Sequence, residues 1–489
     1  MQPAALKISD VRGDPDVAFC AEMSRGLEFY FVKDYSLLDL LMTVPSFCFR
    51  FSRRHSFWRW AAISIGGFAL VIPTLVVAAS DSLSLAGKAQ LFEVDLAERF
   101  LENGQVRVRR RLPSAEYPFI TFNMSDTAYM TGIYCAMQTW RFLATGDEQA
   151  GDRAAEAASA LAHLVEVTGQ PGLLARASMP TGARWFDDGV WRETSDTRYR
   201  WRGNVSSDQV DAFVFGLYVY TEHLADAEER LRVGRAVGAV VDAIVANGHR
   251  IIGFDGRPTT WGHYERDYVV NREPMNALLL LQMLKVAHSL TGLARYDEEY
   301  QRLIDEGYAR IGEQAREDGP PLEVNHSDDV LIALALYPLL ELEHDTEIRA
   351  HYLEAARRWF HGDAYPGIDI EANPFATFLY RHWSGESGAF GDAVGTLRNF
   401  PLDMKWNSGT ITTYAGRFGF VFESEPSVIV DDGRVRPINQ RGRTWSFLVH
   451  NPYLIGGNRH EDSPFETNGL DYLVSYWFGR AHGYIAAER

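Results

Sequence analysis

Cysteine is scarce in this chain, with only Cys20, Cys48 and Cys135 among 489 residues. The first two precede or lie within the segment interpreted below as an export signal, so Cys135 alone would remain in the mature protein. A single cysteine cannot form an internal disulfide and offers no thiolate cluster for a metal ion. Cys135 falls in an apolar helical pattern, which indicates a core position.

Positive charge is also in short supply. The chain has 48 basic and 65 acidic residues and a net charge of -17. Nucleic acids and anionic membrane surfaces repel such a protein, so both are disfavoured as partners. A substrate that is neutral, or that is guided by a local part of the protein surface, fits this net charge better.

Several catalytic signatures are missing from the sequence. It has no glycine-rich phosphate loop, no Gly-x-Ser-x-Gly elbow and no His-Glu-x-x-His pair. Nucleotide-binding, serine-hydrolase and zinc-peptidase interpretations therefore lose their usual support, and we expect no cofactor.

The first 80 residues differ from the rest of the chain. Four arginines, Arg50, Arg53, Arg54 and Arg59, precede an apolar run from Trp60 to Ala79 that ends in small residues. This pattern predicts a cleaved export signal and a periplasmic or extracellular location, although an uncleaved membrane anchor and a twin-arginine route both stay open. Residues 1–41, upstream of Met42, are unusual for a signal, and an over-extended gene start is the simplest explanation.

Beyond residue 80, apolar positions three and four apart predict helices joined in hairpins. The expected pairs are 126–145 with 150–168, 206–224 with 227–247, 273–291 with 295–314, 326–343 with 346–360, and 373–382 with 387–399. A sixth pair can be formed from the ends, 86–103 and 467–485. The first helix of a pair is apolar nearly all round, and its partner carries a charged face. We therefore expect the first helices to form the inner wall of a ring and their partners the outer wall.

These features predict a fold dominated by α-helices, an (α/α)6 toroid forming one domain over 81–489. The rhythm breaks between about 402 and 465, where Phe418–Phe422 and Ser427–Val430 favour a small β-containing insertion.

Three inner helices are expected to begin with the same residue types. An Asn and a Ser lead into Asp126, Asp208 and Asp328. Such residues are ordinary helix caps, and a cap is the simpler interpretation of each one. Their repetition nevertheless predicts a polar rim at one end of the ring.

Four carboxyl groups of this rim are candidates for an acid and base pair: Asp208, Asp211, Glu273 and Asp328. Asp208 and Asp211 are three residues apart and share a helix face. Asp328 follows His326 and precedes Asp329, but the spacing is diagnostic of no metal, and no metal site is predicted.

The substrate-binding candidates surround these carboxyls on the loops 176–203 and 260–276 and at the helix starts. Tryptophan and tyrosine offer flat faces on which a sugar ring can stack, and arginine can bind an acidic sugar, although packing of the loops explains the aromatic residues equally well. The candidates are Asp126, Trp185, Trp201, Arg202, Asn204, Trp261, His263, Tyr264, Arg272, His326, Asp329 and His460.

Three motifs carry a resemblance to a known family: Gly203–Asp211, Asn325–Asp329 and Tyr476–Tyr484. With them the chain resembles the six-hairpin glycosidase-like superfamily over roughly 115–485, particularly a group of secreted bacterial proteins. The resemblance implies an (α/α) toroid and action on carbohydrate. It leaves the reaction open, because related toroids include hydrolases, lyases and epimerases.

The leading hypothesis is a secreted glycoside hydrolase that acts on an oligo- or polysaccharide. The alternatives are a polysaccharide lyase, with Tyr264 or His263 as the base, and a glycan-binding protein without catalysis. Neither nucleic acid nor membrane is an expected partner of the mature form, unless the N-terminal segment is kept as an anchor.

Overall fold

The computed structural model describes residues 83–115, 118–184, 189–320, 324–402, 404, 435, 437–438, 452 and 465–487. The chain divides into two units between residues 49 and 50, and every described residue belongs to the second unit. The export signal and most of the β-containing insertion lie outside the described residues. None of the described helices is both long and apolar enough to cross a membrane.

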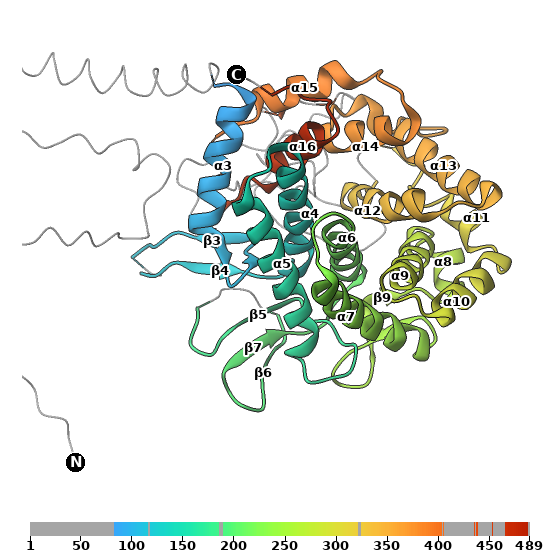
Figure 1. Cartoon of the computed structure of the whole chain (residues 1–489), viewed down its shortest axis with the longest axis horizontal. Helices are drawn as coiled ribbons and strands as arrows, with labels where there is room; N and C mark the ends of the chain where they lie inside the picture. Colours follow the sequence, from blue (N-terminus) through green and yellow to red (C-terminus); the bar gives the residue numbers. More distant parts are fainter. Residues whose placement is uncertain are drawn as a thin grey trace, which may run out of the picture. The chain divides into compact units, whose positions relative to one another are not determined.

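Helices dominate the described residues, and small antiparallel sheets accompany them (Figure 1). The helices are α3 (Leu85–Arg99), α4 (Thr127–Thr145), α5 (Glu148–Glu166), α6 (Ser207–His223), α7 (Ala227–Ala246), α8 (Arg266–Asn271), α9 (Met275–Thr291), α10 (Ala294–Asp305), α11 (Tyr308–Gly312), α12 (His326–Leu342), α13 (Thr346–His361), α14 (Pro374–Ser384), α15 (Phe390–Asn399) and α16 (Leu470–Ala481). Each range predicted as helical contains a helix.

Two details of the helices differ from the prediction. The range 295–314 holds two helices, because Gly307 adopts φ +84° between α10 and α11, a conformation that interrupts a helix. The short helix α8 was not predicted, since its six residues are too few for a clear periodicity.

Burial separates an inner from an outer set of helices. In α12 every residue from Val330 to Leu340 is buried, whereas in α10 only Tyr296, Tyr300 and Leu303 are. The predicted pairs also contact each other, from α4 with α5 through α14 with α15, and α3 contacts α16. The apolar character of each helix therefore follows its place in the fold.

The inner helices contact one another in sequence order. Contacts run from α4 to α6, α9, α12, α14 and α16, and α16 contacts α4 in turn (Figure 1). The core is continuous through these helices.

Glycine allows the tightest of these contacts, between α4 and α6. A Cβ atom added to Gly132 would lie 2.0 Å from the carbonyl oxygen of Ala212, and one added to Gly216 would lie 2.2 Å from the carbonyl oxygen of Gly132. The two backbones therefore touch, which holds the starts of α4 and α6 side by side.

Short strands pair at the loops, and the sequence did not predict those before residue 410. They are β1 (Leu101–Glu102), β2 (Gln105–Val106), β3 (Arg109–Arg111), β4 (Thr121–Asn123), β5 (Ala177–Pro180), β6 (Trp191–Glu193), β7 (Tyr199–Arg202), β8 (Arg250–Ile252), β9 (Pro258–His263) and β10 (Phe465–Thr467). At two to six residues each, they are too short to show an alternating pattern.

Two of the sheets frame the start of α4 and α6. The sheet β10-β3-β4 is antiparallel and places β4 directly before α4. The sheet β5-β7-β6 pairs Ala177 with Arg202, so the residues just before β5 and just after β7 lie together near the start of α6.

Candidate functional site

Asp126 and Asp208 converge from the starts of two different inner helices. Asp126 is the N-cap residue of α4, and Asp208 lies in the first turn of α6. The side-chain nitrogen of Gln209 is 2.6 Å from Asp208 Oδ2 and 3.4 Å from Asp126 Oδ1. These two oxygens are consequently no more than 6.0 Å apart, the sum of the two distances.

A capping box orients Gln209 and Asp208. The Ser206 backbone N–H donates to Gln209 Oε1 over 2.9 Å, and the Ser206 hydroxyl hydrogen-bonds to Asp208 Oδ1. Such reciprocal bonds fix the first turn of the helix. The same turn places the positive end of the helix dipole next to the Asp208 carboxylate.

Arg176 joins the two helix starts. Its guanidinium donates to Ser206 Oγ over 2.8 Å and to the Asn204 carbonyl over 2.7 Å. The same group donates to the Ser125 carbonyl over 3.0 Å and forms an ion pair of 3.4 Å with Asp126. Sequence reasoning gave Arg176 no role, and its only signal was its place at the beginning of the long loop 176–203.

Asp126 has an environment that favours its neutral form. Its side chain is 37% exposed, but protein atoms gather around the carboxyl group and limit its hydration. Burial of the carboxyl group and the charge of Asp208 raise its pKa, while Arg176, Ser125 and Arg202 partly counteract the increase. An acid of this kind can hold a proton for transfer to a substrate.

Asp211 lies one turn deeper in α6 and is fully buried. Neither of its carboxylate oxygens makes a close hydrogen bond to a described residue. Burial raises its pKa well above the usual value, and Asp208 adds to this effect, whereas the nearby Gln282 amide opposes it. Burial therefore favours the neutral form of Asp211.

Asp328 and Glu273 form a second group. Both line a cavity of about 240 Å³ between the start of α9 and the start of α12, together with Arg272. Burial raises the pKa of Asp328 well above its usual value, and the charge of Glu273 adds to the increase. The four catalytic candidates thus fall into two pairs, Asp208 with Asp211 and Glu273 with Asp328.

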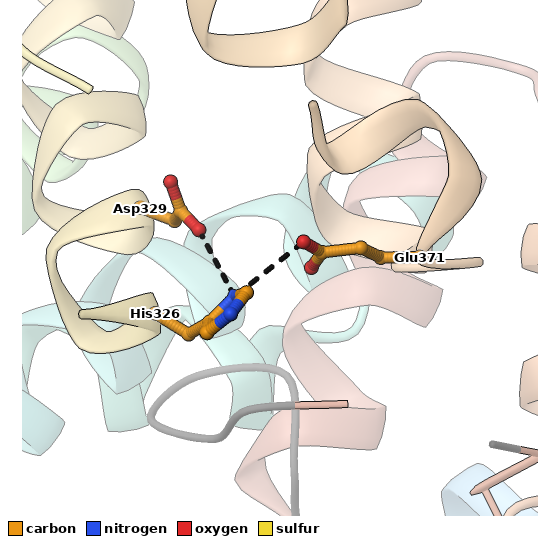
Figure 2. A group of neighbouring side chains, drawn as sticks. All are labelled: His326, Asp329 and Glu371. Atoms are coloured by element: carbon orange, nitrogen blue, oxygen red, sulfur yellow. Dashed lines mark ion pairs between the residues drawn. The ribbon is translucent and has the colours of Figure 1, made fainter. Parts of the chain in front are cut away.

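His326 and Asp329 belong to a buried ionic cluster beside this cavity. His326 Nδ1 lies 3.4 Å from Asp329 Oδ2 and 3.4 Å from Glu371 Oε1, between the two carboxylates (Figure 2). Arg316 pairs with Asp329 over 2.9 Å and with Glu371 over 3.5 Å. Neither Arg316 nor Glu371 was a sequence candidate, because Arg316 stands in the loop before α12 outside any motif and Glu371 is distant in the sequence.

The charges of this ionic cluster balance without a metal ion. Burial opposes a charge on His326, but Glu371 and Asp329 overcome that effect and raise its pKa to about 10. An imidazolium and a guanidinium then face two carboxylates. The ligand atoms of His326, Asp329 and Glu371 lie within 4.8 Å of one another, as in a metal site. A divalent ion there would sit beside the Arg316 cation, which electrostatic repulsion disfavours.

The aromatic candidates differ in their access to solvent. Trp201 is only 2% exposed and Tyr264 is fully buried, so neither ring is open to a sugar as placed. Trp261, in β9, is 37% exposed, so part of its ring is accessible to solvent. The ring of His263 stacks on Tyr268 at a centroid distance of 5.0 Å.

The remaining candidates are Asn204, Arg202 and Arg272, together with two residues outside the described part of the chain. Asn204 adopts φ 53° and its Oδ1 accepts a hydrogen bond of 3.2 Å from Thr260 N, which ties the two loops. Arg202 acts electrostatically on Asp126, and Arg272 is exposed at the cavity. Trp185 and His460 lie outside the described residues.

Comparisons with known proteins add little to this geometry. No family model matches the sequence, and no curated protein matches it. A solved structure described as "Crystal structure of sugar epimerase from ruminal bacterium" is similar with a TM-score of 0.39 and 10% identity, over 79% of this chain and 94% of that chain. A similarity this weak supports no argument about the reaction or the substrate. Membership of the six-hairpin superfamily stays a prediction.

Proposed function

We propose that this protein is a carbohydrate-processing enzyme on an (α/α)6 toroid, and that it hydrolyses a glycosidic bond with Asp126 and Asp208. The observation that carries the proposal is the convergence of these two carboxyls on the Gln209 amide, with Arg176 paired to Asp126 and hydrogen bonds from Ser206 and Gln209 to Asp208. Pairs of carboxyls whose surroundings favour opposite protonation states are typical of glycoside hydrolases.

The roles follow from the surroundings of each group. Asp126, whose pKa is raised, is the acid that protonates the leaving oxygen. Asp208 accepts hydrogen bonds from Ser206 and Gln209 and attacks the anomeric carbon as a carboxylate. This assigns to Asp126 a catalytic role, where the sequence suggested substrate binding.

The separation of the two carboxyls favours retention of the anomeric configuration. The two oxygens near Gln209 are at most 6.0 Å apart. Inverting enzymes keep their carboxyls about 6.5–9.5 Å apart to admit a water molecule, and retaining enzymes about 5–5.5 Å.

The test is a substrate screen followed by substitution of each carboxyl. Asp208→Asn and Asp126→Asn should each lower kcat by at least about 100-fold without changing the circular dichroism spectrum. Asp152→Asn, at an exposed position of α5, is the matched control and should keep full activity. Full activity of either site variant would refute its role, and NMR of the first product formed would report retention or inversion.

A lyase is the second candidate, and the arginines around Asp126 favour it. Arg109, Arg176 and Arg202 all act on Asp126, and such a group could bind a uronate carboxylate. Tyr264, however, is buried, and burial together with Asp211 and Asp208 raises its pKa well above the usual value, which makes it a poor base. An unsaturated product absorbing in the ultraviolet would establish the lyase reaction, and bound but unchanged glycan would indicate a binding protein.

Export to the periplasm or beyond is part of the proposal and rests on the apolar run 60–79 alone. Amino-terminal sequencing of the secreted protein would test it, with cleavage expected near Ala79.

A further inference from the structure

A cavity of about 700 Å³ lies between the helices α5 and α7 and the strands β1, β2, β5 and β7. Neither Asp126 nor Asp208 is among the described residues that line it, so it is separate from the carboxyl site. Sites that hold small molecules in proteins measure about 300–1,000 Å³. Three of the lining residues, Asn103, Glu156 and Glu166, are exposed, so the cavity is open to solvent. It therefore has the size and the access of a ligand site.

The turn between β1 and β2 is fixed against two other walls of this cavity. Gly104 adopts φ +72°, and a Cβ atom added there would lie 2.5 Å from the carbonyl oxygen of Glu156 in α5. The side-chain nitrogen of Gln105 donates to the Ser178 hydroxyl over 3.1 Å, and the Ser178 backbone N–H donates back to Gln105 Oε1 over 3.0 Å. Both of these side chains are buried. The turn is therefore held against α5 on one side and β5 on the other.

Contacts also join α5 to α7 and to β7. The Arg232 guanidinium on α7 donates to the Ser159 hydroxyl on α5 over 2.9 Å. The rings of His163 on α5 and Tyr199 in β7 meet edge to face at a centroid distance of 5.1 Å. A site whose walls are already in place loses less conformational entropy when a ligand binds. The cavity is preformed in this sense.

One side of α5 forms the longest wall and is polar along its length. Glu156, Ser159, His163 and Glu166 all line the cavity, and they follow one another at intervals of three and four residues. Residues so spaced lie along one side of a helix. At 1.5 Å per residue, the wall from Glu156 to Glu166 is roughly 15 Å long. Its length suits an extended polar ligand better than a single ion.

This wall contains a buried nitrogen without a partner. His163 Nε2 is buried, and it has no hydrogen-bond partner among the described residues. Buried polar atoms in proteins nearly always have a partner, whether protein, water or ligand. A neutral imidazole donates from one nitrogen and accepts at the other, and a hydroxyl group can pair with either. A ligand rich in hydroxyl groups would therefore satisfy this nitrogen.

The charges of the cavity favour a neutral ligand. The carboxylates of Glu156 and Glu166 are accompanied by one guanidinium, that of Arg232, so a phosphate or sulfate group would be repelled. Within the described ranges, only the ionic cluster brings ligand atoms as close together as a metal site does. Carboxylates accept hydrogen bonds from hydroxyl groups and a guanidinium donates to them, so all three charged groups can bind a neutral sugar.

We propose that this cavity binds a short stretch of a neutral glycan, as a second carbohydrate site that holds a polysaccharide while the carboxyl site acts on it. The proposal rests on the proposed function, because it takes the substrate to be a glycan chain. The sheet β5-β7-β6 connects the two places: Ala177 pairs with Arg202 near the start of α6, and Pro180 pairs with Tyr199 at the cavity. These pairs are roughly 10 Å apart along the strands, a distance that a glycan chain can span.

The experiment is native affinity electrophoresis of the full chain in gels that contain laminarin, glucomannan, xylan or dextran. All samples carry Asp208→Asn, so that the polysaccharide is not digested during the run. We expect at least one of these neutral glycans to retard the protein. Adding His163→Ala, which removes the unpartnered ring, or Glu156→Trp, which fills the cavity from an exposed position, should raise the dissociation constant at least about tenfold.

Asp152→Trp is the matched control. It adds the same ring at an exposed position of α5, one turn before Glu156 and outside the cavity lining, and it should be retarded as the parent protein is. Circular dichroism would confirm that all variants fold. No retardation by any of the four glycans would overturn the proposal, as would equal retardation of the control and both cavity variants, or stronger retardation by anionic polygalacturonate.

Kinetics separate this proposal from the proposed reaction. In the enzyme with Asp208 intact, His163→Ala and Glu156→Trp should leave kcat on a short oligosaccharide unchanged and raise KM for the polysaccharide. An unchanged KM for the polysaccharide in both variants would refute the second site and leave the reaction at Asp208 standing. Full activity of Asp208→Asn would refute that reaction, whereas binding at the cavity would still be measured by the same gels.

Discussion

Three aspartates at neighbouring places of the site show how position alone assigns different chemistry to one residue type. Asp208, in the first turn of α6, is hydrogen-bonded and partly exposed, whereas Asp211, one turn further, is fully buried with only the Gln282 amide acting to favour its charged form. Asp126 on α4 lies between these extremes. The spacing of Asp208 and Asp211 in the sequence predicted a shared helix face but not these differences in burial.

Asp211 should make the protein less stable as the pH rises. Its pKa is raised in the folded state above the unfolded value of about 3.9, so the folded protein keeps a proton that the unfolded chain releases. The free energy of unfolding then falls with increasing pH above about 4, by at most about 1.4 kcal/mol per pH unit. Asp211→Asn, which imitates the protonated acid, should remove this part of the decline.

Urea unfolding between pH 4 and pH 7 would measure that difference. Asp152→Asn, on the exposed face of α5, provides the control and should follow the wild type at every pH. If the free energy of unfolding changes equally with pH in the wild type and in Asp211→Asn, then Asp211 does not hold a proton in the folded state.

His326 should act with the same sign over a higher pH range. Its pKa of about 10 in the fold lies above the unfolded value of about 6.5, because Glu371 and Asp329 outweigh the effect of burial. Its contribution is fully present below about pH 6.5 and disappears as the pH rises through about 10. His326→Gln should cost about 3–5 kcal/mol at pH 6, since it leaves buried carboxylates underpaired.

Unfolding free energies at pH 6 and pH 10 would test this. We expect the difference in unfolding free energy between the wild type and His326→Gln to become smaller as the pH rises. A difference that stays constant would mean that His326 is neutral throughout, and the ionic cluster would then be a better candidate for a metal ion.

Among the elements, the pair α4 and α6 positions the site. Their backbones touch at Gly132 and Gly216, which brings Asp126 and Asp208 to one place. The sheets around the start of α4 and α6 add Arg176 and Arg109 to the same region.

Gly216→Ala should disturb both stability and activity. The added methyl group would lie 2.2 Å from the Gly132 carbonyl oxygen, so α4 and α6 must separate. We expect a loss of about 1–3 kcal/mol in unfolding free energy, and a lower kcat because the two carboxyls move apart. The measurements are chemical denaturation and turnover of the substrate found by screening.

Gly395→Ala is the matched control for this substitution. Gly395 lies inside α15, and nothing would come within 4 Å of its new methyl group. Alanine there should be neutral or stabilise the helix by up to about 1 kcal/mol. An equal effect at both positions would show that the contact between α4 and α6 is not tight.

At the scale of the whole described unit, the inner helices form a closed series of contacts. α16, near the end of the chain, contacts both α4 and α3 near its beginning. An open stack of hairpins can unfold from its ends, whereas a closed series has no free end at which to begin. Unfolding should therefore be cooperative across the described helices.

Truncation after Asn468 tests that expectation. It removes α16 and exposes the apolar faces of α4 and α14, so we expect rapid proteolysis of the entire helical unit. Truncation after Ile485, which keeps α16, is the control and should resist proteolysis as the full chain does. Survival of the folded helices α6 to α13 without α16 would show that closure is not needed.

Much of this could be predicted from the sequence because it depends on local patterns. Apolar periodicity located the helices, and recurring Asn, Ser and Asp residues marked the starts of α4, α6 and α12. The short strands could not be predicted because two to six residues show no clear alternation, and the division of the catalytic candidates into two pairs could not be predicted because it depends on residues far apart in the chain.

The sequence by itself determined where helices form and which of their residues are polar, since propensity and periodicity act over a few neighbours. Only the tertiary structure decided that Arg176 joins Asp126 to Ser206, that Arg316 and Glu371 enclose His326, and that Trp201 is buried. The physical reason is that charge pairing and burial depend on distance in space, which packing of the helices sets.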